Sequence, residues 1–543
     1  MKKRTLALIL SAAMCLSVAL SGCTADEPSQ SASTPAPGGE TSAPAEEGGK
    51  SLTIAVLNDV ISLDPAAKDS GSEMQMASHL YDPLVDYDAD LTKKPGLAES
   101  WTILEDGVTW EFKLRQGVKF SNGNDFNADD VVFSFERILN DPTLEMGVYL
   151  MRLQEVKKVD DYTVQLVTKI PYPVFAGSLV HIMMLDKETC EGLTSEEIAA
   201  NPVGTGRYRL EEHVKESYIK LVRNDDYWGE LPEAETVEFR VIANAATRTT
   251  ALINGEVDFI SNIPVMDADR LKSDANIQVV TNPSLSCSYM GFDLLNEHGS
   301  AGTDDPNPLL NVKVRQAIYH AIDIQTIIDT VMNGYATVAN SYMPSICVGY
   351  NPDAERPAYD PELAKQLLAE AGYPDGFYLR IDARSDSDIN ADQVSQAIAS
   401  YLEKVGITTE VNLLPRASFY EKVDAENLQS SFFMAGWGDG SGEGMVIFND
   451  MLYTYNGKPG MGEGNKGHYS NPEVDALLEK HLLRPTRTSA RPWWSRWIRS
   501  PGTRPPMCPC FSRIISSACA PGCSTPPAPT TISWLGISPF KTT

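Results

Sequence analysis

Residues that could do chemistry by their type and spacing are few in this chain of 543 residues. Cys508 and Cys510, and then Cys519 and Cys523, have spacings that superficially match metal-binding pairs. The separation of the pairs and the many prolines around them do not suit a structural zinc site. The seven histidines are scattered without the spacing of metal ligands. We therefore expect no bound metal and no other cofactor.

The contiguous motifs of common hydrolases and nucleotide-binding enzymes are missing. The sequence contains no H-E-x-x-H, no G-x-S-x-G and no G-x-x-x-x-G-K-[ST]. Gly204 and Gly206 suggest a phosphate loop, but a full G-x-G-x-x-G is missing and a strand-like segment follows, so a structural turn explains them better. We expect a protein that is not an enzyme. An extracellular hydrolase remains a remote alternative, because catalytic triads are assembled from distant residues.

The amino-terminal residues have the pattern of a lipoprotein signal peptide. Three basic residues at positions 2–4 precede an apolar run, Leu6 to Leu20, that is short for a membrane span. The run ends in Leu-Ser-Gly-Cys, which predicts cleavage before Cys23 and lipid attachment to that cysteine. An ordinary secretory signal with an incidental cysteine is the alternative. We expect a chain outside the cytoplasm, anchored through Cys23 to the outer face of the cell membrane or on its periplasmic side.

The composition of the remainder is that of a globular protein with an acidic surface. The net charge is −28 and 42% of the residues are hydrophobic. Such acidity disfavours nucleic acid and anionic membrane surfaces as partners. Cys190, Cys287 and Cys347 are far apart in the sequence, and we expect them to be buried free thiols rather than a disulfide framework.

Residues 484–543 differ abruptly from the rest of the chain. They contain no Asp or Glu, but seven arginines, 11 of the 35 prolines and four of the nine cysteines. Helical periodicity ends at Leu483. An amino-acid sequence of this composition results when a GC-rich gene is read in the wrong frame. We therefore interpret the segment as the product of a frameshift near codon 484. The alternative is a genuine Cys-rich appendage.

The segment Pro95–Arg137 carries the most information about the fold. Trp110, Phe112 and Leu114 alternate with polar residues, which predicts a half-buried strand. After a turn, Asn127 is placed to cap a helix whose first turn carries two aspartates, where the helix dipole favours negative charge.

The order of these elements resembles the signature of the family 5 bacterial extracellular solute-binding proteins, the receptors of ABC importers for peptides, nickel and oligosaccharides. Ser62–Pro65, with the Leu-Asp-Pro that similar proteins carry beside the cleft, and Asn201–Tyr208 extend the resemblance. Arg207 departs from it, since proline is common there. The resemblance ends near Leu483. Family members continue beyond this point with a helix and with strands that return to the first lobe, and we expect the frameshift to remove those strands.

The family resemblance implies an α/β, periplasmic-binding-protein-like fold of two lobes, type II, with an extra subdomain in the first lobe. Strand patterns that alternate with helical ones, as at Leu309–Ile328 and Val394–Val405, favour α/β lobes with parallel-rich sheets. We expect a signal peptide at 1–22 and a disordered tether at 23–50. A first lobe at 51–287 and a second lobe at 288–483 would follow, and an aberrant tail would occupy 484–543.

Four residues are candidates for ligand binding by resemblance to peptide-binding members. Gly436, Trp437 and Asp439 end a strand in a Gly-rich loop, where similar proteins place an Asp that pairs with the peptide ammonium. Glu443 could serve instead, Asp439 could merely stabilise its own turn, and Trp437 could be core. Arg384 lies about where relatives hold the ligand carboxylate, which a planar guanidinium suits, or else it is a surface arginine.

These observations predict a monomeric, extracytoplasmic substrate-binding protein. It would capture short peptides between its lobes and deliver them to the permease subunits of an ABC transporter. A receptor for a nickel chelate or an oligosaccharide in the same fold is the alternative.

Overall fold

The computed structural model describes residues 50–88, 91–298, 305–385, 390–438, 440, 442–457, 461–482 and 507–519. The signal peptide, the tether and Cys23 lie outside these residues, as does Asp439. None of the helices in this part of the chain is long and apolar enough to cross a membrane.

The segment that carried the sequence argument folds as predicted. Strand β5, Thr109–Leu114, buries Trp110, Phe112 and Leu114. The Asn127 side chain then accepts a hydrogen bond from the backbone of Asp129, and Asp130 completes a capping box for helix α2, Ala128–Asn140. The alternation of apolar residues and the cap therefore both specify local structure here.

The extra subdomain of the first lobe is a four-stranded antiparallel sheet with the strand order β4-β5-β7-β6. Helix α2 contacts β6 and β7 of this sheet. A two-stranded ladder, β2-β3, lies nearby in the chain. The additional strands of these two sheets are β2 Val85–Tyr87, β3 Lys93–Pro95, β4 Ala98–Ile103, β6 Leu153–Asp160 and β7 Thr163–Thr168.

The main sheet of the first lobe has the order β11-β1-β10-β9-β8. Its strands are β1 Ser51–Val56, β8 Tyr208–Val214, β9 Tyr218–Arg223, β10 Thr236–Val241 and β11 Phe259–Ser261.

Seven α-helices and two 3-10 turns accompany the first-lobe sheets in the described chain. Besides α2 they are α1 Gly71–Leu80, α3 Phe175–Ser178, α4 Lys187–Cys190, α5 Ser195–Ala200, α6 Ala245–Ile253, α7 Val265–Lys272, η1 Glu145–Leu150 and η2 Leu179–His181.

The second lobe is built on the strand order β15-β14-β16-β12, with the short strand β13 to one side. Its buried core combines helix residues such as Ile318, Val394 and Ile398 with Ile381 and Phe432 of the sheet. The strands are β12 Gln278–Phe292, β13 Ala336–Val338, β14 Tyr378–Arg384, β15 Thr408–Leu414 and β16 Phe432–Gly438.

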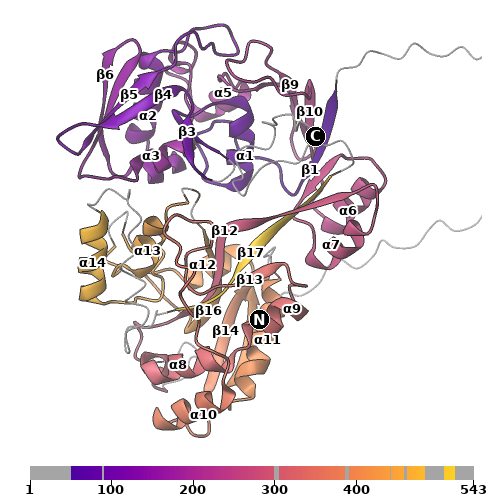
Figure 1. Ribbon diagram of the computed structural model, residues 1–543, viewed down its shortest axis with the longest axis vertical. Coiled ribbons are helices and arrows are strands. Elements are labelled where there is room, and N and C mark those ends of the chain that lie inside the picture. The colour runs from indigo at the N-terminus through magenta and orange to yellow at the C-terminus, as the bar shows by residue number, and fades with distance from the viewer. Residues whose placement is uncertain are drawn as a thin grey trace, which may run out of the picture. The chain divides into compact units, whose positions relative to one another are not determined.

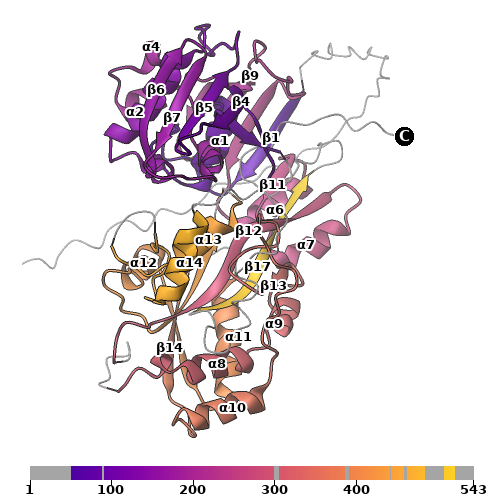
Figure 2. The same cartoon turned by 60° about the vertical axis from the view of Figure 1, so that its left-hand side comes forward.

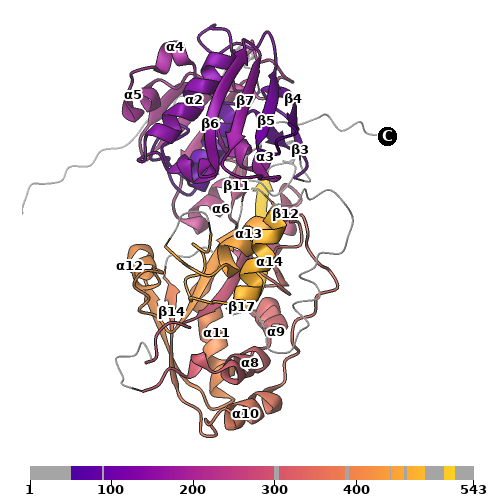
Figure 3. The ribbon, with the colours of Figure 1, turned by 90° about the vertical axis from the view of Figure 1, so that its left-hand side faces the viewer.

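One helix that the sequence pattern predicted in the second lobe is divided into two in the structure. The predicted helix Leu309–Ile328 is two helices, because Asp323 caps the second one through the backbone of Thr326. Helices α13 and α14 lie beside each other on the face shown in Figure 3. The elements are η3 Pro308–Leu310, α8 Val312–Ala321, α9 Ile324–Thr330, α10 Pro361–Glu370, α11 Ala391–Glu403, α12 Arg416–Lys422, α13 Gly444–Leu452 and α14 Pro472–Leu482.

The sheets are mixed, and the expectation of parallel-rich sheets is wrong. Four of the fourteen strand pairings in the described chain are parallel: β1 with β10 and β11, and β14 with β15 and β16. The others are antiparallel: a short turn connects β8 to β9, a longer loop connects β9 to β10, and the whole subdomain sheet is antiparallel.

Long strand β12 joins the two lobes. Its first residues, Gln278–Pro283, pair with β17, which itself pairs with β11 of the first lobe. Its last residues, Ser286–Phe292, pair with β16. The predicted lobe boundary between Cys287 and Ser288 therefore falls inside one strand. Strand β17, Met507–Cys519, runs antiparallel to β12 along most of its length, as the yellow strand of Figures 1 and 2 shows.

The position of β17 corrects one expectation about the tail. A frameshifted tail was expected to leave the sheet without its returning strand, yet β17 pairs with β12, β11 and β13. Every residue except proline carries the same backbone N–H and C=O groups, so an extended segment of unusual composition can still pair with an open strand edge. Pro509 has no backbone N–H to donate. It lies opposite Tyr289 of β12, at a position where β17 pairs with neither β11 nor β13 among the described residues.

Restoring the original reading frame after codon 484 should raise the melting temperature and the soluble yield of the protein. The pairing of β17 supplies hydrogen bonds, but stability also depends on side chains that fit the neighbouring core. Differential scanning fluorimetry of the two chains makes this comparison. Equal melting temperatures would contradict this expectation and show that the missing segment is dispensable for stability.

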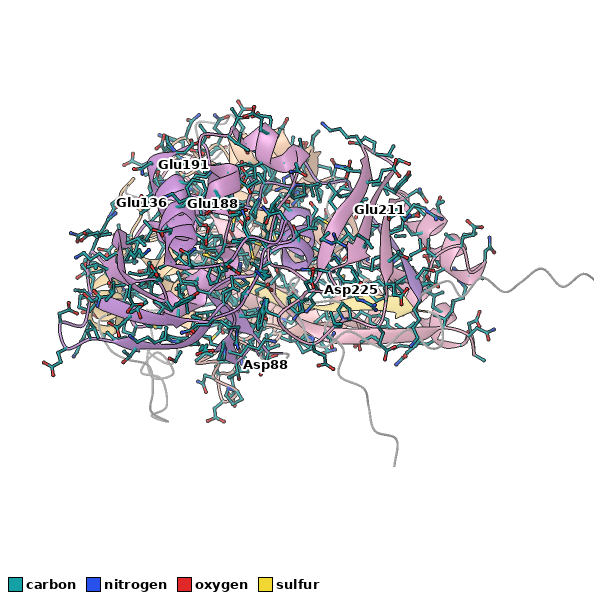
Figure 4. All side chains as sticks on the ribbon, turned by 90° about the horizontal axis from the view of Figure 1, so that it is seen from above. Asp88, Glu136, Glu188, Glu191, Glu211 and Asp225 are labelled. Carbon is teal, nitrogen blue, oxygen red and sulfur yellow. The ribbon has the colours of Figure 1, made fainter. Side chains whose placement is uncertain are left out.

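Acidic side chains are spread over the surface of the first lobe. Figure 4 labels Glu136 on α2, Glu188 on α4, Glu211 on β8 and Asp225 after β9, and all four are exposed. They come from separate elements, so this part of the negative charge forms a solvated surface. Cys190 is a buried free thiol, as predicted, and Cys287 and Cys347 are buried as well.

Candidate functional site

The candidate site lies where strand β16 ends. Phe432 and Phe433 at its beginning are fully buried, and Gly436 near its end is exposed. A side chain on Gly438 would collide with Ser286 of β12, because a Cβ there would lie 2.5 Å from the Ser286 hydroxyl oxygen. The packed start of the strand fixes the place from which the following Gly-rich loop leaves the sheet.

This loop of the second lobe packs against the first lobe. Glu443, at the end of the loop, forms an ion pair with Lys93 of β3. A Cβ built on Gly442 would lie 3.1 Å from Leu91, and one built on Gly440 would lie 2.7 Å from the His181 ring. Residues far apart in the sequence therefore meet at the boundary between the lobes.

Trp437 is held by an acid that the sequence analysis did not find. Its indole N–H donates a hydrogen bond to Asp450 of α13, and Asp450 also accepts one from the backbone of Gly464 at 2.8 Å. Burial raises the pKa of Asp450, while these two hydrogen bonds oppose the rise. Trp437 is half-buried and packs against the large apolar cluster, so its orientation is fixed.

Arg384 lies on β14, the strand that pairs with β16. It is the last residue of β14, and its guanidinium lies 5.9 Å from the ring centroid of Tyr420 on α12. Arg416 faces the same ring at 5.7 Å. Two cations beside one aromatic ring provide positive charge that suits a carboxylate.

Tyr289 of β12 is buried within electrostatic range of Asp450 and Tyr420. Burial raises its pKa, and the nearby Asp450 and Tyr420 raise it further. The Asp450 carboxylate that accepts from Trp437 and the Tyr420 ring beside Arg384 therefore both influence the Tyr289 hydroxyl. Pairs this distant in sequence give no local pattern from which they could be predicted.

Asp439 lies outside the described residues, but Glu443, the alternative acid for the ligand ammonium, lies within them. The carboxylate of Glu443 is 8% exposed and already faces the ammonium of Lys93. A ligand ammonium would compete with Lys93 for this group, so we retain Asp439 as the candidate acid.

Asp64 of the Leu-Asp-Pro motif belongs to the interior of the first lobe. It is buried and bound by Arg137 of α2, whose Nη1 is 3.1 Å from Oδ1, and by the Ser195 hydroxyl at 2.6 Å. A helix histidine is likewise structural, because the Nδ1 atom of His320 is 2.7 Å from the carbonyl oxygen of Ala358. In the described part of the chain, no three His, Cys, Asp or Glu side chains gather as a metal site.

Replacing Glu443 with glutamine should weaken closure of the lobes. The Lys93–Glu443 pair joins the two lobes and is largely shielded from solvent, so its loss leaves Lys93 without a matching charge. Small-angle X-ray scattering of ligand-saturated protein should give a larger radius of gyration for the variant. Glu145→Gln is the matched control, since Glu145 pairs with Lys68 at 2.6 Å within the first lobe. Equal radii for both variants would contradict a role in closure.

Comparison with known proteins places the fold and the site in one family. Residues 92–459 match the family model described as bacterial extracellular solute-binding proteins, family 5 Middle. The glutathione-binding protein GsiB of Shigella flexneri is 30% identical over 442 residues, which span 80% of this chain and 83% of that protein.

Solved structures agree with this match. HbpA2 from Haemophilus parasuis is 28% identical with a TM-score of 0.74, covering 87% of this chain and 96% of that one. The periplasmic binding protein DppA from Helicobacter pylori, in complex with the peptide STSA, is 25% identical with a TM-score of 0.73, covering 90% and 98%.

The two-lobed α/β fold with its interlobe contacts defines an extracytoplasmic binding protein, not an enzyme. The chain belongs to family 5 of the bacterial extracellular solute-binding proteins and is a solute-binding receptor of an ABC importer.

Proposed function

We propose that this receptor captures short peptides between its lobes and hands them intact to the permease subunits of its transporter. The observation that carries the proposal is the packing of the loop after Trp437 against Leu91 and His181 of the first lobe. A solute enclosed there would contact both lobes and would favour the closed arrangement.

The charges on the two sides of the site suit the two ends of a peptide. Asp439 follows Trp437 closely in the sequence and would neutralise the ammonium group. Arg384 and Arg416, both facing Tyr420, would attract the carboxylate. Main-chain groups of the peptide would pair with backbone at the strand ends, a mode that tolerates many side chains.

The relatives support a peptide ligand. Glutathione, named for GsiB, is a tripeptide, and DppA was solved with the peptide STSA. A nickel chelate and an oligosaccharide remain the alternative ligands in this fold.

Native mass spectrometry of receptor purified from its own cells tests the proposal, because tightly bound solutes survive transfer to the gas phase. The expected result is an adduct whose mass and fragments identify a short peptide. A nickel complex or a sugar as the adduct would replace the peptide and leave the receptor assignment standing.

We also propose that the receptor is a monomer held at the membrane by lipid on Cys23. Substituting Cys23→Ser should move the protein from the membrane fraction to the soluble extracytoplasmic fraction, since no thiol would remain for acylation at that position. Fractionation and immunoblotting measure the distribution, with Cys190→Ser as the control, because Cys190 is a buried thiol of the folded lobe. Retention of the Cys23→Ser protein in the membrane fraction would contradict lipid anchoring there.

A further inference from the structure

His181 is a buried histidine whose two ring nitrogens both lack a hydrogen-bond partner. The residue ends η2 in the first lobe and is only 2% exposed. Among the described residues, His181 is the one side chain with two buried polar atoms that lack a hydrogen-bond partner. A buried polar group without a partner destabilises a fold, so the imidazole at this position needs another explanation.

The surroundings of the ring place it at the boundary between the lobes. One face of the ring lies against Tyr149, with the centroids 4.3 Å apart and the planes at 32°. A Cβ built on Gly440 would lie 2.7 Å from the ring carbon Cε1 and 3.0 Å from Nε2. The Nε2 edge therefore faces the second-lobe loop, one residue after the candidate acid Asp439 in the sequence.

The ring is neutral, which decides what it can bind. Burial lowers the pKa of His181 to about 4, and no neighbouring charge contributes to the shift. In a neutral imidazole, one nitrogen donates a hydrogen bond and the other accepts one. A peptide main-chain amide offers the complementary pair, an acceptor carbonyl and a donor N–H.

A second buried histidine of the first lobe provides the contrast. His79 has its pKa lowered to about 4 by the same cause, but its Nδ1 is 2.6 Å from the carbonyl oxygen of Gln75. Its ring packs against Tyr208 and Phe239, both in the same lobe. His79 thus has a partner for Nδ1, although its Nε2 has none, whereas both ring nitrogens of His181 lack a partner.

We infer that His181 is a ligand-binding residue of the interlobe site and hydrogen-bonds a main-chain amide group of the bound peptide. The inference rests on the proposed function and adds a first-lobe contact to a site otherwise formed by second-lobe residues. The contact is made to the peptide backbone, so it acts on peptides of any side-chain composition.

Calorimetric titration of the full chain with di- to pentapeptides and glutathione tests the inference. His181→Phe keeps an aromatic ring beside Tyr149 but removes both nitrogens, and it should lower peptide affinity roughly 5- to 150-fold. His181→Gln retains one donor and one acceptor and should recover part of that loss. His79→Phe is the matched control and should leave the affinity unchanged.

The outcomes separate the two proposals. Peptide affinity that is equal in His181→Phe and the unmodified chain overturns the role of His181 and leaves the proposed function intact. An unmodified chain that binds no peptide overturns the proposed function, and the His181 contact with it.

A measurement on the unmodified chain covers the case in which His181→Phe fails to fold. The chain is labelled with ¹⁵N-histidine, and the ring resonances of His181 are assigned as those missing from His181→Gln. Peptide addition should shift at least one of the two ring nitrogens. Ring resonances of His181 that stay unchanged at saturation would overturn the inference.

Discussion

The Asp439→Asn variant is expected to bind short peptides with a free amino terminus about 30- to several-thousand-fold more weakly than the unmodified receptor. The carboxylate would face the peptide ammonium in a site closed off from water. Removing one partner of such a charge pair costs roughly 2–5 kcal/mol, much of it because the remaining charge is left unmatched. Isothermal titration calorimetry measures the change directly.

A control and a modified ligand make this prediction specific. Asp125→Asn removes an equally charged residue that pairs with Lys119 at 2.6 Å on the exposed surface of the first lobe, and it should leave affinity unchanged. N-acetylated peptides, which have no ammonium group, should bind the unmodified receptor weakly. Unchanged affinity in Asp439→Asn, together with tight binding of acetylated peptides, would reject the ammonium role.

Substituting Asp64→Ala is expected to lower the free energy of unfolding by about 3–5 kcal/mol. Asp64 is 1% exposed and receives hydrogen bonds from Arg137 and from Ser195 at 2.6 Å. The substitution leaves the Arg137 guanidinium, which is 12% exposed, without its anion inside the first lobe. Urea denaturation followed by tryptophan fluorescence measures the loss.

Two further variants distinguish a buried ion pair from a general effect of losing a carboxylate. Asp125→Ala removes a surface pair and should cost about 0–1 kcal/mol. The double variant Asp64→Ala with Arg137→Met should be more stable than Asp64→Ala alone, because no buried charge then lacks a partner. Equal losses for Asp64→Ala and Asp125→Ala would contradict the structural role of Asp64.

Local patterns in the sequence predicted local structure well. The alternation through Trp110, Phe112 and Leu114 became β5, and Asn127 capped α2, because strand burial and helix capping depend on residues within one turn or one strand. The break between helices α8 and α9 at Ile322 and Asp323 was not predicted, although the aspartate that caps α9 can be seen in the sequence.

The site was predicted only in part, because its contacts join distant residues. The Gly-Trp motif located the loop after β16, but Asp450, which holds Trp437, has no recognisable spacing. The contact between His181 and Gly440 joins residues far apart in the sequence and depends on how the two lobes meet. Hydrophobic periodicity and short motifs report on neighbours along the chain and carry no information about such pairs.

The tail shows the converse case. Its composition indicates a frameshift, and this remains our interpretation, yet residues 507–519 pair as β17 between β11 and β12. Composition describes side chains, whereas the pairing uses backbone groups that every residue except proline carries in full. The strand register therefore does not show how the tail affects stability, and the comparison with the frame-restored chain measures that effect.

Calorimetry of the receptor with defined di- to pentapeptides and glutathione tests the central claim most directly. We predict saturable binding of one peptide per chain, a smaller radius of gyration in the bound state, and recovery of the peptide uncleaved after release. Binding of a nickel complex or an oligosaccharide, with no binding of any peptide in the panel, would contradict the claim that this protein is a peptide receptor.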